Sequence, residues 1–175
     1  TSSLNQLSTG QIASLSVAAL AKVSTTQIQA IGTAVLKGLS ANQIKALTTS
    51  QINNLTSSQV YNLTNGQISS LTSSQIANLK TENFAYISTA QAGWSTDQIK
   101  ALAPTQIGSF TTTQINSLST NQIRALTGDQ IKALTTSQIT NLGTSQASAL
   151  VTSQVAALTA KQLGAIGSDD LQKLN

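Results

Sequence analysis

Residues 48–55 read TTSQINNL, residues 56–63 read TSSQVYNL and residues 64–71 read TNGQISSL. The three stretches share an eight-residue form, Ser/Thr-x-x-Gln-Ile/Val-x-x-Leu, here termed the octad and numbered from its Ser or Thr as position 1. A period of fixed length is typical of repeat proteins, in which each unit packs on its neighbours. The sequence therefore predicts a repeat architecture.

The octad register covers almost the whole chain. Residues 8–87 make ten octads, the seven-residue unit STAQAGW at 88–94 interrupts the register, and residues 95–174 make ten more. We expect one octapeptide-repeat solenoid over residues 1–175, with its repeat break at 88–94. Because the chain starts inside a repeat and without Met, we also expect it to be a piece of a longer protein.

Each octad carries a signal for the start of a helix. Ser or Thr followed three residues later by Gln is the capping-box pattern, in which the hydroxyl and the Gln side chain each accept from a backbone N–H of the first turn. Positions 5 and 8 are three residues apart, so their aliphatic side chains share one face of a helical turn. The sequence predicts an all-α solenoid, a superhelix of very short helices with one helix per eight-residue repeat.

Two other folds fit the repeat less well. In one continuous helix, an octad turns through about 800°, so the aliphatic stripe rotates by about 80° from one octad to the next and forms no seam. A ladder of strands is disfavoured because β-branched residues do not alternate with period two. Isolated helices below about 12 residues are marginal in water, so we expect stability to come from the stacking of octads.

The helical arrangement assigns a role to each position of the octad. At about 100° per residue, positions 1, 4, 5 and 8 cluster on one side of the helix and position 6 lies opposite. Position 6 is therefore predicted to face water, in agreement with its basic residues: Lys37, Lys45, Lys100, Arg124 and Lys132. We expect the Gln at position 4 to be partly buried, where an amide can both donate and accept. Alternatively, duplication of the repeat copied this Gln without such a role.

The composition excludes most kinds of chemistry. The absence of Cys and His removes disulfides, thiolate nucleophiles, imidazole catalysis and the common zinc sites. Charged residues make up 8% of the chain, and the nine basic residues behind its net charge of +4 are spread along the sequence. We therefore expect no nucleic-acid binding. Apolar runs are too short for a transmembrane helix, so we expect no membrane insertion. We expect no enzyme activity, no cofactor and no metal, because no nucleophile–base pair, metal cluster or phosphate loop is present.

The break at 88–94 is the main departure from the repeat. Three of the five aromatic residues lie in or beside it: Phe84, Tyr86 and Trp94. A missing residue leaves a gap or a bend that bulky rings can fill, so the first interpretation is packing. The second is an aromatic patch that docks a peptide or a glycan, which makes these three the candidate partner-binding residues. The third interpretation is that the break is a remnant of repeat duplication and has no role.

Repeated over essentially the whole chain, the octad resembles the short-period Ser/Thr/Gln-rich arrays of very large secreted or surface-attached bacterial proteins of adhesin type. The resemblance implies a structural segment, an extracellular spacer or adhesion rod, that is secreted or at the cell surface. Its partners would be neighbouring repeats of a longer chain or further copies through self-association. One alternative is a solenoid module that binds a peptide or a glycan, and a minor one is a repeat that binds ice or another surface through its Thr hydroxyls.

Overall fold

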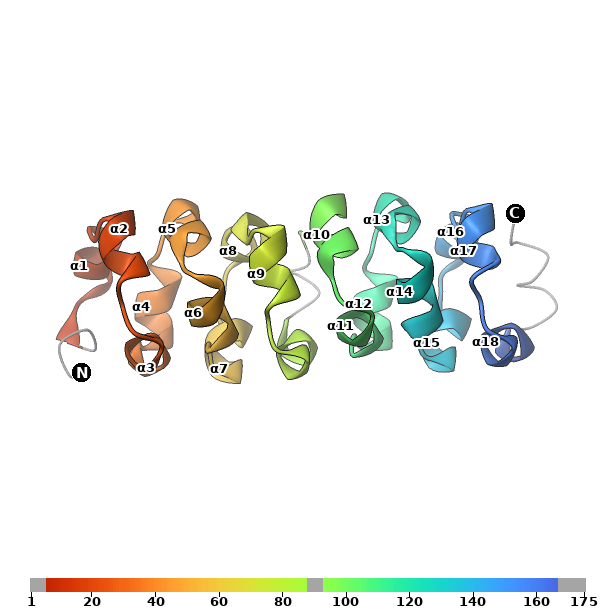
Figure 1. Ribbon diagram of the computed structural model, residues 1–175, viewed down its shortest axis with the longest axis horizontal. Coiled ribbons are helices and arrows are strands. Elements are labelled where there is room, and N and C mark those ends of the chain that lie inside the picture. Colours follow the sequence, from red (N-terminus) through yellow and green to blue (C-terminus); the bar gives the residue numbers. More distant parts are fainter. Residues whose placement is uncertain (1–5, 88–92, 167–175) are drawn as a thin grey trace. The chain divides into compact units, whose positions relative to one another are not determined.

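A computed structural model of the chain describes residues 6–87 and 93–166 (Figure 1). The described residues are helical or form short turns and bends, with no strand among them, so the all-α prediction is confirmed. The chain divides into two compact units, Thr1–Gly93 (unit 1) and Trp94–Asn175 (unit 2). The division lies at the end of the seven-residue unit that breaks the register. Whether both units form the one solenoid expected over residues 1–175 stays a prediction.

Each described octad contributes one short helix, as predicted. Unit 1 contains α1 (Thr9–Ala13), α2 (Val17–Ala21), α3 (Thr25–Ala30), α4 (Thr33–Lys37), α5 (Ala41–Ala46), α6 (Thr49–Asn53), α7 (Ser57–Tyr61), α8 (Asn65–Ser70), α9 (Ser73–Ala77) and the 3-10 helix η2 (Thr81–Tyr86). Unit 2 contains α10 (Thr96–Ala101), α11 (Pro104–Gly108), α12 (Thr112–Asn116), α13 (Thr120–Ala125), α14 (Gly128–Ala133), α15 (Thr136–Thr140), α16 (Thr144–Ala147), α17 (Thr152–Val155) and α18 (Ala160–Ala165).

Two extended residues make the corner between successive helices. Between α5 and α6 these are Leu47, at φ −60° and ψ 140°, and Thr48, at φ −67° and ψ 156°. The first residue is position 8 of one octad and the second is position 1 of the next. No described residue has a positive φ, so the corners place no demand for glycine on the sequence. The Ser or Thr of the capping-box pattern is thus an extended N-cap residue at this corner.

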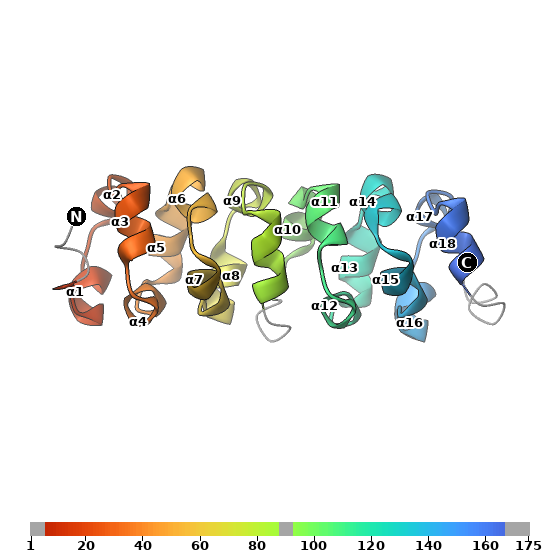
Figure 2. The same ribbon diagram turned by 90° about the horizontal axis from the view of Figure 1, so that it is seen from below.

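Within each unit, helices pack on the third helix along the chain. In unit 1, α2 contacts α5 and α5 contacts α8, and these helices follow one another along the upper edge of the unit in Figure 1. In unit 2, α11 contacts α14 and α14 contacts α17, which follow one another along the upper edge in Figure 2. One turn of each solenoid therefore takes at least three octads.

The core of each unit is a row of aliphatic side chains from positions 5 and 8. Ile52 is 0% exposed and Leu55 is 2% exposed, and the same positions are buried in the octads on either side. Each fully buried Ile or Leu stabilises the fold by about 1.5–3 kcal/mol relative to an exposed one. Position 6 faces solvent as predicted, since its five basic residues are exposed: Lys37, Lys45, Lys100, Arg124 and Lys132.

The backbones of α11 and α14 approach closely at Gly108. A Cβ at this residue would lie 2.8 Å from the carbonyl oxygen of Ala133 and 4.0 Å from its Cβ. Gly108 holds position 6 of its octad and Ala133 holds position 7 of the third octad along. The close approach is thus made at this pair of residues, and the absence of a side chain at Gly108 permits it.

Gly108→Ala is expected to lower the free energy of unfolding by about 1–3 kcal/mol, because the added methyl forces α11 away from α14. Gly66→Ala is the matched control, since no described atom lies within 4 Å of the Cβ it would add in α8. There Ala is expected to stabilise the helix by about 0.5–1 kcal/mol. Urea denaturation followed by circular dichroism measures both changes, and the same sign for both would contradict the proposed contact.

Candidate functional site

The Gln at position 4 is a buried side chain that makes contacts in two directions. Gln67 is 3% exposed. Its Oε1 accepts from the backbone N–H of Thr64 at 2.9 Å, which closes one half of the capping box. Its Nε2 donates to the carbonyl oxygens of Leu36 at 2.8 Å and Leu39 at 2.9 Å. The same amide thus caps the start of its own helix and forms hydrogen bonds to the preceding turn of the solenoid.

The same bonds recur along both units and are termed the glutamine ladder. Each amide donates to the carbonyl 28 residues earlier, and each one whose carbonyl 31 residues earlier lies among the described residues donates to that carbonyl as well. These acceptors lie in the fourth repeat unit back, while helices stack on the third helix along, so a turn takes between three and four octads. The ladder comprises Gln43, Gln51, Gln59, Gln67 and Gln75 in unit 1, and Gln122, Gln130, Gln138, Gln146, Gln154 and Gln162 in unit 2.

The chemistry of the amide explains why Gln rather than Glu holds this position. An amide has an oxygen that accepts and an NH₂ group with two donors. The carbonyl at position 8, such as that of Leu39, follows the end of its helix and has no partner within it. The ladder supplies that partner, and no buried side-chain nitrogen or oxygen of the described residues lacks a hydrogen bond. The expectation that a buried amide donates and accepts along the stack is confirmed.

The predicted capping boxes are present, but their two halves are separable. In α6, the hydroxyl of Thr48 accepts from the Gln51 N–H at 3.1 Å, and Gln51 Oε1 accepts from the Thr48 N–H at 2.7 Å. Five of the described helices begin without a hydroxyl at the N-cap, and in three of these, at Ala103, Gly143 and Val151, the Gln half remains. Conversely, α2 keeps the hydroxyl cap of Ser16 with Ala19 in place of Gln, so either half can be present without the other.

Thr64→Ala is expected to lower the free energy of unfolding by only about 1 kcal/mol. The substitution removes the bond from the Gln67 N–H to the Thr64 hydroxyl, at 3.2 Å, and leaves the contacts of the Gln67 amide in place. The reverse change, Ala103→Ser, adds a hydroxyl to a helix that begins without one and is expected to stabilise by a similar amount. Thermal unfolding of both variants tests this, and a loss for Ala103→Ser would refute the capping argument.

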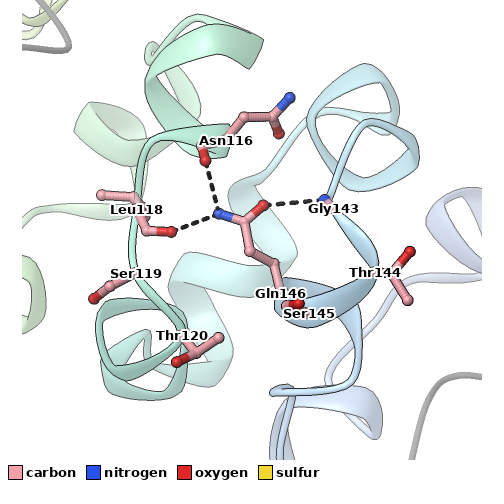
Figure 3. A pocket seen from close by; sticks show the side chains of 8 residues that line it. All are labelled: Asn116, Leu118, Ser119, Thr120, Gly143, Thr144, Ser145 and Gln146. Carbon is pink, nitrogen blue, oxygen red and sulfur yellow. Dashed lines mark hydrogen bonds between the residues drawn. The ribbon is translucent and has the colours of Figure 1, made fainter.

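An open cleft of about 410 Å³ lies at the corner that begins with Gly143 (Figure 3). Its lining is uncharged: Asn116, Leu118, Ser119, Thr120, Gly143, Thr144, Ser145 and Gln146. The buried Gln146 amide is already engaged, since Oε1 accepts from the Gly143 N–H at 3.1 Å and Nε2 donates to the Asn116 and Leu118 carbonyls. A second cleft of about 400 Å³ lies at the next corner, beside Val151 and Arg124. Both clefts open where the cap residue has no hydroxyl, and neither brings an acid and a base together.

The described residues contain no cluster of three or more side chains from His, Cys, Asp and Glu that could hold a metal ion. Lys132 and Asp129 form an ion pair at 3.5 Å, with both side chains largely exposed. Such exposed pairs contribute little to stability. No described helix combines the length and the apolar character that crossing a bilayer requires.

The aromatic residues beside the break take different places. Phe84 holds position 5 of its octad in unit 1 and is fully buried. In unit 2, Trp94 is 4% exposed, its ring lies 6.4 Å from that of Phe110, and its carbonyl accepts from the Gln122 amide at 2.6 Å. Trp94 therefore takes the place that the Leu at position 8 has in a complete octad. Only Tyr86 of the three candidate partner-binding residues exposes much of its side chain, so their docking role stays a prediction that depends on Tyr86.

The octad that contains Phe84 also departs from the ladder. Asn83 replaces Gln, and its shorter side chain reaches the Leu55 carbonyl at 3.4 Å, while its Oδ1 accepts from the Ser57 hydroxyl at 3.3 Å. The N-cap residue is Lys80, with no side-chain cap bond, and the helix that follows is a 3-10 helix. Loss of both halves of the capping box accompanies this tighter helix.

Sequence reasoning missed one exposed aromatic side chain. Tyr61, at the end of α7, is 60% exposed. It lies three octads before Tyr86 and is far from the break in the sequence. It occupies position 6 of its octad, which is a solvent-facing position of the repeat. Its presence at a position otherwise held by small, polar or basic residues was the only available signal.

Comparison with known families supports the repeat character of the chain. Residues 20–57, 28–65 and 108–136 match the family model described as the ALTTAQ repeat. The first two segments overlap within unit 1 and the third lies in unit 2. No curated protein matches the chain. The repeat family indicates a structural repeat protein, and the chain is a tandem short-repeat protein similar over these segments to the ALTTAQ repeat.

Proposed function

We propose that the chain is a structural segment of an extracellular protein, a spacer or adhesion rod that is secreted or held at the cell surface. The glutamine ladder is the observation that supports this most, because the same amide joins turn to turn from Gln43 to Gln75 and from Gln122 to Gln162. Each bond depends only on the octad, so octads can be added without a new kind of contact. Repeat number can then set length.

The composition supports a place outside the cell. Ser, Thr, Asn and Gln provide most of the polar side chains, and charged residues make up only 8%. There is no Cys and no Met, so the chain has no sulfur for oxidants to attack. We therefore propose an oxidising environment as its working place.

The proposed partners are neighbouring repeats of a longer chain or further copies of the same one. Nine Lys and Arg residues are distributed along the sequence rather than gathered in one stripe, which argues against a nucleic-acid partner. We propose no catalytic role, no cofactor and no membrane insertion. The repeat fold itself, rather than a reactive site, is the functional element in this proposal.

Small-angle X-ray scattering tests the spacer role. A compact domain of 175 residues has a radius of gyration of about 16 Å. For a spacer we expect a clearly larger value that does not change when the protein is diluted. Dilution is the control, because self-association would raise the value with concentration. A radius near that of a compact domain would rule the spacer out.

Protease treatment of intact source cells tests the extracellular location. We expect peptides of this chain to be released from intact cells, while a cytoplasmic marker protein stays whole. Release only after the cells are lysed would contradict the proposed location and would leave the scattering result unaffected.

A further inference from the structure

All five aromatic residues are described, and they form two groups. Phe84, Trp94 and Phe110 are buried and complete the core. Tyr61 and Tyr86 are exposed by 60% and 48%. Tyrosine combines an apolar ring with a polar hydroxyl and is enriched at binding interfaces. The exposed aromatic surface of the described chain therefore consists of these two tyrosines.

The repeat places Tyr61 and Tyr86 on two helices that pack together in unit 1. Tyr61 ends α7 at position 6, Tyr86 ends η2 at position 7, and α7 and η2 pack together. Gly108 and Ala133 hold the same two positions in unit 2, where a Cβ at residue 108 would touch the Ala133 backbone. The sequence separation is 25 residues in both pairs. The packing of α7 on η2 thus brings the two tyrosines onto adjacent helices of unit 1.

Neither tyrosine is required by the octad. Position 6 is elsewhere small, polar or basic, and position 7 is elsewhere small, Asn or Lys. The core beneath α7 and η2 is already filled by Val60 and Phe84, which are both fully buried. The two large rings are thus additions to the outer surface of unit 1.

We propose that Tyr61 and Tyr86 form a binding surface for a neutral carbohydrate chain. A sugar ring has an apolar face of C–H groups, which the negative face of an aromatic ring attracts, and a rim of hydroxyls. The exposed Ser58, three residues before Tyr61, and the half-buried Asn62 after it offer a hydroxyl and an amide suited to that rim. Helices α7 and η2 carry one charged side chain, Glu82, and the N-cap residue of η2, Lys80, carries the opposite charge. Together these residues have no net charge, which suits an uncharged ligand.

This inference is independent of the spacer role, because a solenoid of any length and location could carry the surface. The probes are three neutral oligosaccharides, cellohexaose, maltohexaose and chitohexaose, each titrated into the ¹⁵N-labelled full chain and followed by amide chemical shifts. We expect at least one to bind, with the largest shifts in α7 and η2. Tyr61→Ala and Tyr86→Ala are each expected to weaken binding about tenfold.

Matched variants separate loss of the rings from loss of the fold. Tyr61→Phe and Tyr86→Phe keep the rings and are expected to keep the stacking part of the affinity. Val151→Ala, at another exposed apolar residue, is expected to leave binding unchanged. Circular dichroism of each variant confirms that the helices are intact.

Three outcomes would overturn the proposal. The wild-type chain could bind none of the three sugars, or the double variant Y61A/Y86A could bind as tightly as the wild type. A proline-rich decapeptide, titrated as a further probe, could shift the same amides while the sugars do not. That result would assign the surface to a peptide and reject the carbohydrate.

Discussion

Gln67→Glu is expected to lower the free energy of unfolding by about 3–5 kcal/mol at neutral pH. Glu can still accept from the Thr64 N–H, so the cap is kept. The Leu36 and Leu39 carbonyls, however, lose the donor that lies 2.8 and 2.9 Å away and face a buried carboxylate oxygen instead. The loss is measured by urea denaturation followed by circular dichroism. It is expected to be smaller in acidic buffer, because a protonated carboxyl carries no charge and regains one donor.

Gln27→Glu is the matched control for this prediction. Gln27 has a full capping box with Ser24, but it is only half-buried and its Nε2 has no acceptor among the described residues. The same substitution there is expected to change stability by about 0.5 kcal/mol or less. An equal loss at both residues would show that the cap, and not the bonds between turns, is what Glu disturbs.

Phe84→Ala is expected to lower the free energy of unfolding by about 3–5 kcal/mol, because it removes a fully buried ring from position 5 of its octad. The cost combines the lost burial with the cavity that remains. Phe84→Ile returns the residue that the repeat usually has at this position and is expected to recover most of the loss. Thermal and urea unfolding of both variants measure the difference.

Tyr86→Ala tests the same helix from its outer side. Because Tyr86 is about half exposed, we expect a much smaller loss of stability than for Phe84→Ala. If Tyr86→Ala instead destabilised the protein as strongly as Phe84→Ala, Tyr86 would be a packing residue and its proposed role in binding would fail. Comparable small losses for both would mean that η2 contributes little to the core.

Much of the fold could be predicted from the sequence because it is local. The capping box joins residues three apart, such as Thr48 and Gln51, and the core pair Ile52 and Leu55 is also three apart. Both patterns lie inside one octad, so each octad by itself specifies a helix start, a buried face and a corner. The exposed basic residues at position 6 follow from the same geometry.

The candidate site was only partly predictable. The burial of Gln at position 4 follows from its place beside the core, but its acceptors 28 and 31 residues earlier do not. The three aromatic residues beside the break were grouped because they are close in sequence. Phe84 and Trp94 lie in the cores of units 1 and 2, whereas the exposed Tyr86 lies on η2, which packs on the helix that ends with Tyr61, three octads earlier.

By itself, the sequence determined that this protein is a helical repeat, where each helix begins and which side chains are buried. The tertiary structure alone decided how many octads make a turn, which carbonyls each Gln holds and which surface residues become neighbours. The physical reason is that the path of a solenoid is the sum of small rotations at successive corners, such as that at Leu47 and Thr48. A contact across a turn depends on that sum, and no single octad contains it.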